Sequence, residues 1–147
     1  MLKIFNDLEP FFQDNYRRIN VREYARLSRI SPPSASKILS QLHKEALLNR
    51  EEDRNYIYFS ANKESPVFII LSRAYWLLRL KKIGLADCIE KNMINPVVIL
   101  FGSFSKAEAK QDSDMDIAIF TPSKRGINPE PFEKRLKHKF KFLSSGI

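Results

Sequence analysis

Two carboxylates separated by one residue follow a Gly-Ser pair, and together these groups could bind a phosphate and a divalent cation. Asp114 and Asp116 enter an alternating apolar segment, so in a strand they would share one face. Gly102 permits a sharp turn and close backbone approach to a ligand, and Ser103 offers a hydroxyl and a backbone N–H. Carboxylate oxygens suit Mg²⁺, and free amides at a helix start suit phosphate. Such a set is typical of phosphoryl or nucleotidyl transfer.

Two predicted strands would position these groups. Val97–Phe101 is a short β-branched run between a proline and a glycine, which predicts a buried strand. Residues 105–110 predict a short helix after the Gly-Ser turn. Asp114–Phe120 alternates and predicts a second strand, with its apolar residues on the face opposite the acids. The alternative is a solvated pair of acids at a strand entrance.

The order of strand, Gly-Ser, ten residues and Asp-x-Asp resembles the nucleotidyltransferase superfamily of the DNA polymerase β type, especially its small prokaryotic members. The matching residues are Gly102, Ser103, Asp112, Ser113, Asp114 and Asp116. The resemblance implies a mixed sheet with helices, a nucleoside triphosphate substrate (ATP first among them), and Mg²⁺ or Mn²⁺ on Asp114 and Asp116 as the catalytic metal ligands. It also implies that Gly102 and Ser103 bind the triphosphate, with Lys106 near it.

The sequence departs from the family pattern in places that bear on catalysis. The family usually carries a third carboxylate on a later strand, whereas no Asp or Glu follows Glu133. The Arg-Gly that often follows Gly-Ser is replaced by Lys106-Ala107. Three alternatives stay open: an active transferase, one whose carboxylate comes from a partner or from chain beyond Ile147, and a degenerate domain.

The N-terminal segment predicts two short helices joined by a tight turn. Asn20, as part of a capping box, and Ser31, followed by proline, each read as the N-cap of a helix. Predicted strands at residues 47–50 and 55–59 surround a polar tip at 51–54. A helix-turn-helix followed by a β-wing is the resulting prediction.

This order of helices and wing resembles the winged helix-turn-helix domain of prokaryotic transcription regulators. The resemblance implies that the second helix of the pair enters the major groove of double-stranded DNA. The predicted DNA contacts are Ser34, Ser36, Lys37 and Gln41 on that helix, with Arg50 and Arg54 flanking the wing. Residues 1–66 carry 11 Lys+Arg and 9 Asp+Glu, so a single copy is expected to bind DNA weakly. A module that mediates only protein contacts is the alternative.

Between and after these motifs the sequence predicts further helices and one strand. A Ser-Pro pair opens a helix at 67–83, which is apolar almost all round and is expected to be buried on several sides, to connect the domains and to form a homodimer seam. A short helix is predicted at 85–91, a basic helix at 131–139 and a strand at 139–143. The basic run at 124–141 is either a solvated face or the lining of a triphosphate or nucleic-acid groove.

Composition limits the setting of the protein. The 147 residues include 25 basic and 17 acidic ones, a net charge of +8 that favours polyanionic partners. The single cysteine, Cys88, excludes an intramolecular disulfide and suits the cytoplasm. The acidic N-terminus does not read as a signal peptide, and arginines interrupt the longest apolar stretch, so no membrane association is predicted.

The sequence thus predicts an α+β fold in three parts. Residues 1–64 form a winged helix-turn-helix, 65–95 a helical connector and 96–147 a minimal nucleotidyltransferase core. The resemblance implies that such a core continues beyond Ile147 with further strands or helices. The predicted function is Mg²⁺-dependent transfer of a nucleoside monophosphate from a nucleoside triphosphate to an acceptor hydroxyl. Because the small relatives include antitoxins that modify a toxin, a partner protein is the expected acceptor. The alternative is a DNA-binding transcription regulator with a catalytically degenerate transferase domain.

Overall fold

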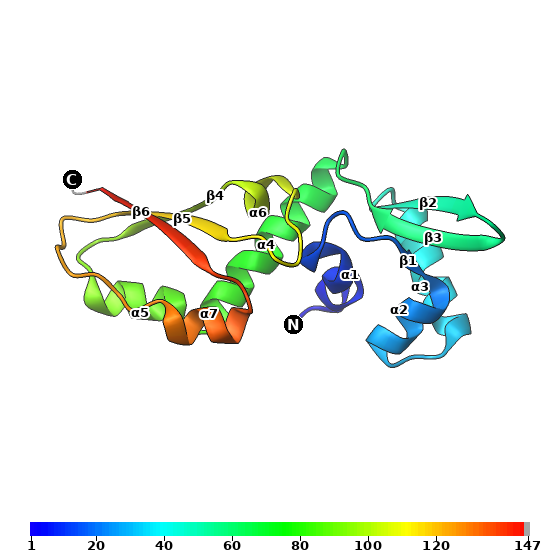
Figure 1. The fold of residues 1–147 in the computed structure, drawn as a ribbon, viewed down its shortest axis with the longest axis horizontal. Helices are drawn as coiled ribbons and strands as arrows, with labels where there is room; N and C mark the ends of the chain where they lie inside the picture. Colours follow the sequence, from blue (N-terminus) through cyan, green and yellow to red (C-terminus); the bar gives the residue numbers. More distant parts are fainter. Residues whose placement is uncertain (146–147) are drawn as a thin grey trace. The chain divides into compact units, whose positions relative to one another are not determined.

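In a computed structural model, which describes residues 1–145, the chain forms two compact units (Figure 1). The N-terminal unit consists of Met1–Leu71 and Ala107–Lys110. The C-terminal unit consists of Ser72–Lys106 and the chain from Gln111 onward. The three domain limits predicted from the sequence stay predictions. No helix within residues 1–145 has both the length and the apolar character needed to cross a membrane.

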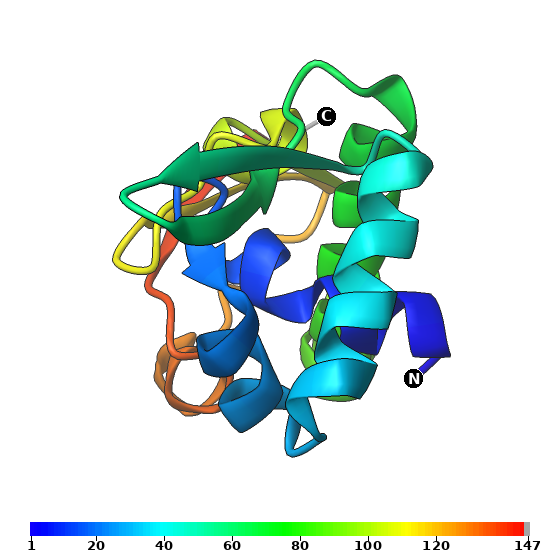
Figure 2. The ribbon, with the colours of Figure 1, turned by 90° about the vertical axis from the view of Figure 1, so that its right-hand side faces the viewer.

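The N-terminal unit combines helices with a small antiparallel sheet of strand order β1-β3-β2. In Figure 2 the hairpin of β2 and β3 lies across one end of α3, which contacts β2. The elements are α1 (Lys3–Gln13), β1 (Ile19–Asn20), α2 (Val21–Ser28), α3 (Pro32–Lys44), β2 (Leu48–Asp53) and β3 (Tyr56–Ala61), followed by the start of α4 (Pro66–Lys82). The fully buried core side chains include Leu8, Phe11, Phe12, Tyr24, Leu39 and Phe68.

Side-chain hydrogen bonds cap the N-terminal ends of α2 and α3 at the residues that the sequence predicts. The Asn20 side chain accepts from the Glu23 N–H at 2.8 Å, and the Ser31 hydroxyl accepts from the Ser34 N–H at 3.3 Å. The carboxylate of Glu23 pairs with the Arg17 guanidinium, so it does not serve the reciprocal half of the predicted capping box.

The predicted limits of the wing are wrong. Strand β2 continues to Asp53, and the turn consists of Arg54 and Asn55, both left-handed with φ of 49° and 68°. Two left-handed residues make the primed turn that matches strand twist, and Asn accepts that conformation readily. Glu51 and Glu52 therefore belong to strand β2, although they were predicted to form the tip of the wing.

The C-terminal unit is built on a mixed sheet of strand order β4-β5-β6, as predicted. Strand β4 is antiparallel to β5, and β5 is parallel to β6. After the rest of α4 the elements are α5 (Leu85–Asn92), β4 (Val97–Phe101), α6 (Ser103–Lys106), β5 (Met115–Phe120), α7 (Glu130–Leu136) and β6 (Phe140–Ser145).

One face of this sheet is the core of the unit. Met115, Ile117 and Ile119 are buried, as predicted for this face of β5, and on the other face Ala118 is buried while Asp116 and Phe120 are partly exposed. Leucines and isoleucines of α4 and α5 lie with Leu100 and Ile117 around an apolar cavity of about 250 Å³. The opposite face therefore carries the acidic residues of β5, because successive side chains alternate between faces.

Three other predictions about this unit need correction. Strand β4 was predicted to be buried, but Val97 is 52% exposed and Ile99 is 46% exposed because β4 is the edge strand of the described sheet. Helix α4 was predicted to be buried on several sides, yet Leu77 and Leu78 are exposed. The helix after the Gly-Ser turn begins at Ser103, two residues before its predicted start, and ends at Lys106.

Helix α7 also ends earlier than predicted, because Lys137 adopts a left-handed conformation that caps it. The predicted short helix after Gly84 and the predicted last strand are both present, as α5 and β6.

Candidate functional site

The two carboxylates lie on the face of the sheet opposite the buried side chains Met115, Ile117 and Ile119. Asp116 lies in register with Phe101, the last residue of β4, and Asp114 immediately precedes β5. Both side chains are half-buried. The end of β4 thus brings the Gly-Ser turn beside the acid pair, as the sequence predicts.

Gly102 packs so closely against Asp116 that any side chain at this position would displace the carboxylate. Its φ is +72°, and a Cβ atom added there would lie 2.2 Å from Oδ2 of Asp116. The left-handed backbone by itself favours glycine, and a side chain here would also force the Asp116 carboxylate to move. The carboxylate of Asp116 and the start of α6 therefore form one packed unit.

Asp116 has no polar partner among the residues that the structure describes, since none of the hydrogen bonds or ion pairs there involves its carboxylate. A half-buried carboxylate without a partner is costly unless a cation or donor accompanies it. The hydroxyl of Ser103, which also lacks a partner there, begins α6 next to it.

Asp114 has a partner that the sequence analysis did not assign to the site. Nζ of Lys141 lies 3.5 Å from Oδ2 of Asp114. Lys141 is in register with Asp116 on the parallel strand β6, and residues in register project to the same face. The predicted strand 139–143 contained this lysine, but only the β5–β6 pairing reveals its neighbour.

An aromatic cluster holds the two motifs in position. Phe104, which follows Ser103, is fully buried and packs edge-on against Trp76 and His138, with ring centroids 4.8 Å and 5.0 Å away. Nδ1 of His138 lies 2.8 Å from the carbonyl oxygen of Ser113 and donates to it, because a carbonyl can only accept. The cluster therefore fixes both the residue after the Gly-Ser pair and the residue before Asp114.

Further hydrogen bonds brace the turn. The Ser105 hydroxyl donates to the Gly102 carbonyl at 2.9 Å, and Nε of Arg73 donates to the Ser105 carbonyl at 2.5 Å. Lys106, predicted to lie near the triphosphate, is the exposed last residue of α6. Asp112 is exposed before the acid pair.

These residues fit one divalent cation. Asp114 and Asp116 supply carboxylate oxygens, and the close seat of Asp116 on Gly102 fixes the orientation of one of them. Mg²⁺ commonly binds one or two carboxylates and completes its shell with water and substrate phosphates. Within residues 1–145, no group of three or more His, Cys, Asp or Glu side chains is placed to hold a metal.

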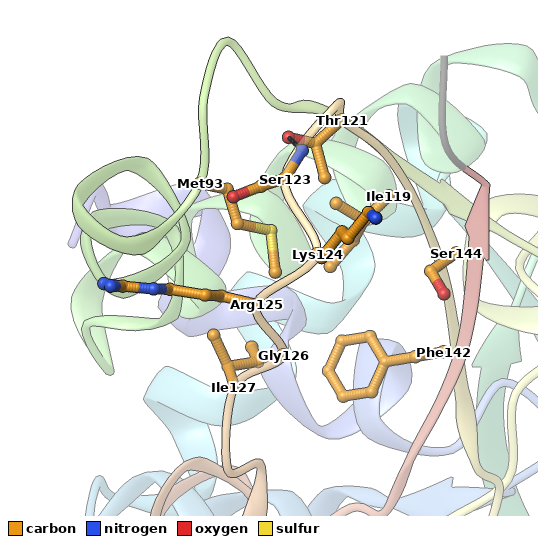
Figure 3. Close-up of a pocket in the computed structure, with 10 residues that line it drawn as sticks. All are labelled: Met93, Ile119, Thr121, Ser123, Lys124, Arg125, Gly126, Ile127, Phe142 and Ser144. Atoms are coloured by element: carbon orange, nitrogen blue, oxygen red, sulfur yellow. Dashed lines mark hydrogen bonds between the residues drawn. The ribbon is translucent and has the colours of Figure 1, made fainter.

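A separate pocket of about 420 Å³ lies at the other end of β5 (Figure 3). Its lining comes from loop residues 121 and 123–127, from Ile119 and Met93, and from Phe142 and Ser144 of β6. None of the predicted site residues lines it.

The predicted DNA contacts lie on the surface of the N-terminal unit. Ser34, Ser36, Lys37 and Gln41 are exposed along α3. Arg54 is in the turn of the hairpin, whereas the Arg50 guanidinium is paired with Glu52 at 3.1 Å. Arg18 pairs with Glu51 and Asp53, so much of the hairpin charge is compensated within the unit.

A basic stripe on α2 escaped the sequence analysis. Arg22 and Arg26 of α2 are exposed at i and i+4, Arg29 is the exposed left-handed residue that caps the end of the helix, and none of the three forms an ion pair with the described residues. Helical spacing places such residues on one side of a helix. The spacing of these arginines is visible in the sequence, but the DNA contacts were predicted on the following helix, α3.

Comparison with known proteins bears on the C-terminal unit. Residues 85–144 match the family model described as "Polymerase beta, Nucleotidyltransferase". The matched segment contains the Gly-Ser turn, the acid pair and Lys141. Searches of curated proteins and of solved structures returned no match. The family-model match supports a nucleotidyltransferase domain at residues 85–144, the kind of domain that the motif predicted.

Proposed function

We propose that this protein is a nucleotidyltransferase that moves a nucleoside monophosphate from a nucleoside triphosphate, ATP in the first place, to an acceptor hydroxyl. The observation that carries the proposal is the close packing of Asp116 against Gly102. This packing places a carboxylate that has no polar partner among the described residues next to the Gly-Ser turn. Preorganised charge and positioning supply most of the rate enhancement in this chemistry.

Each residue of the site has a distinct task in the proposed reaction. The backbone and hydroxyl of Ser103 bind the triphosphate, and Asp114 and Asp116 hold Mg²⁺ or Mn²⁺. The bound ion would supply charge stabilisation at the phosphates. The acceptor oxygen attacks the α-phosphorus, the bond to the bridging oxygen breaks, and pyrophosphate leaves. The acceptor proton passes to water, because the described part of β6 brings no carboxylate to this face.

A partner protein is the proposed acceptor, as in the antitoxin-like relatives to which the motif is similar. The test is transfer of label from α-³²P-ATP with Mg²⁺ to protein in extracts of the source cells. Asp116→Asn should abolish the labelling, while Glu108→Gln, which removes an exposed carboxylate, should leave it unchanged. Equal labelling by wild type and Asp116→Asn would refute the proposal.

We propose as a second function that the N-terminal unit binds double-stranded DNA as a winged helix. The order of α1, β1, α2, α3 and the β2–β3 hairpin supports this assignment. In helix-turn-helix domains the first helix of the pair crosses the phosphate backbone while the second enters the major groove. Arg22 and Arg26 on α2, with Arg29 at its C-terminal end, would make the phosphate contacts. The alternative of a regulator with an inactive transferase domain stays open within this proposal.

We also propose that the protein is a homodimer. Apolar residues that the sequence analysis assigned to a dimer seam are exposed on α4, among them Leu77 and Leu78, and the edge strand β4 is uncharged and exposed. Uncovered apolar edges favour association with another chain. Light scattering after gel filtration should give twice the monomer mass, and replacing Ile99 with lysine should return the monomer.

A further inference from the structure

Lys141 is the residue of β6 that lies beside the acid pair Asp114 and Asp116. It is in register with Asp116 across the parallel β5–β6 pair, and its ammonium contacts Asp114 at 3.5 Å. Two carboxylates and one ammonium therefore share this sheet face. This arrangement differs from a site with three carboxylates, because the strand adds a positive charge where a ligand would add a negative one.

The charge balance limits how many divalent cations the face can hold. Two-metal sites place their ions about 3.5–4 Å apart, so anionic ligands must offset the repulsion between them. Here Asp114 and Asp116 offer two negative charges, the ammonium of Lys141 cancels one, and no third metal-ligating side chain joins them within the described residues. A second divalent ion beside the lysine would meet two positive neighbours and lack a ligand.

We propose that the site binds one divalent cation and that Lys141 supplies the second positive charge toward the triphosphate. This inference rests on the proposed transferase function. Without nucleotide, the ammonium is paired with Asp114 and competes with the metal for that carboxylate. With nucleotide, the ammonium moves to a phosphate oxygen and frees Asp114 for the cation.

The structure favours such a movement. The side chains of Lys141 and Asp114 are 69% and 39% exposed, and exposed ion pairs of this kind stabilise a protein little. Lysine is a compact point charge on a flexible stem, which suits a group that exchanges partners. Metal and nucleotide should therefore bind with positive coupling, since each releases a charge that the other uses.

The test uses Mn²⁺ counted by electron paramagnetic resonance and a non-transferable ATP analogue, α,β-methylene-ATP, measured by calorimetry on the full chain. Lys141→Met removes the charge and keeps the bulk. We expect one Mn²⁺ per wild-type chain. In Lys141→Met we expect metal affinity to rise roughly fivefold without nucleotide, about the effect of one unit charge near 4 Å in water. Affinity for the analogue should fall about tenfold, the loss of one charge-assisted phosphate contact.

Lys141→Glu should create a second Mn²⁺ site. Lys91→Met and Lys91→Glu are matched controls, because Lys91 is an exposed lysine of α5, which packs on the opposite face of the sheet, and they make the same charge changes. Both should keep wild-type affinities within about twofold, as surface charges at that separation are largely screened. Circular dichroism melts check that every variant is folded.

Two Mn²⁺ ions on the wild type, or Lys141 variants indistinguishable from the Lys91 controls, would overturn the inference. Failure of the analogue to bind any form would refute the proposed function and the phosphate role of Lys141. The Mn²⁺ count would still decide the number of cations, so the two failures can be told apart.

Discussion

Replacing Gly102 with alanine tests whether Asp116 packs directly against the backbone of Gly102. The added Cβ would lie 2.2 Å from Oδ2 of Asp116, whereas ordinary contact begins near 3.4 Å, so the carboxylate must move by about 1.2 Å. A left-handed backbone costs alanine about 1–2 kcal/mol. With the displaced contact, the free energy of unfolding should fall by about 2–3 kcal/mol.

The functional loss should exceed the loss of stability. A shift of about 1 Å in a positioning group can lower a reaction rate about 10²-fold. We therefore expect at least this loss of label transfer, together with weaker Mn²⁺ binding, at temperatures where the variant stays folded. Urea unfolding gives the stability, and the transfer assay with Mn²⁺ titration gives the function.

Two other glycines separate the causes. Gly84 has φ of +88°, but its nearest neighbours to an added Cβ are 3.9 Å away, so Gly84→Ala carries backbone strain without a clash. Gly126 has no atom within 4 Å of an added Cβ, so Gly126→Ala should change neither property. If Gly102→Ala transfers label and binds Mn²⁺ as well as Gly84→Ala, the reasoning about the seat of Asp116 is wrong.

Other predictions address the supports of the site and the N-terminal unit. His138→Ala removes the hydrogen bond from His138 to the Ser113 carbonyl and should lower label transfer at least tenfold, with a loss of about 2 kcal/mol in unfolding free energy by urea titration; unchanged transfer would contradict the positioning role. Arg26→Ala should reduce the salt dependence of DNA binding by about one phosphate contact in mobility-shift titrations, and an unchanged slope would exclude α2 from the interface. Burial raises the pKa of Tyr24 from 10.0 to about 12, so the phenol favours the folded state below pH 10 and that contribution is lost as pH rises to 12. Tyr24→Phe should therefore lose less stability than wild type over that interval in urea titrations, and equal slopes would refute the assignment.

Local interactions explain why much of the fold could be predicted from the sequence. Ser31 and Ser65 cap helices through hydrogen bonds that reach only three residues along the chain. The alternation of β5 also depends on neighbours in sequence, and it correctly predicted that Asp116 would be opposite the buried row. The closeness of Gly102 and Asp116 followed from a motif whose two halves lie on adjacent strands.

The misses concern contacts between distant segments. An apolar run such as Val97–Phe101 predicts a strand but cannot say whether a helix or strand covers each side, and here β4 is an exposed edge. The partner of Asp114 depended on which residue of β6 the parallel pairing sets beside β5, and Lys141 is 27 residues away along the chain. His138 was not predicted to take part in the site, because its role depends on packing against Phe104 and Trp76, which are distant in the sequence.

The central claim is that Gly102, Asp114 and Asp116 form a site for a nucleoside triphosphate with a divalent cation. Calorimetric titration of α,β-methylene-ATP, with and without Mn²⁺, tests it most directly on the wild type and Asp116→Asn. We predict binding to the wild type that requires Mn²⁺ and is weakened at least tenfold in Asp116→Asn. Equal binding by the two proteins, or no binding by the wild type with Mn²⁺ present, would contradict it.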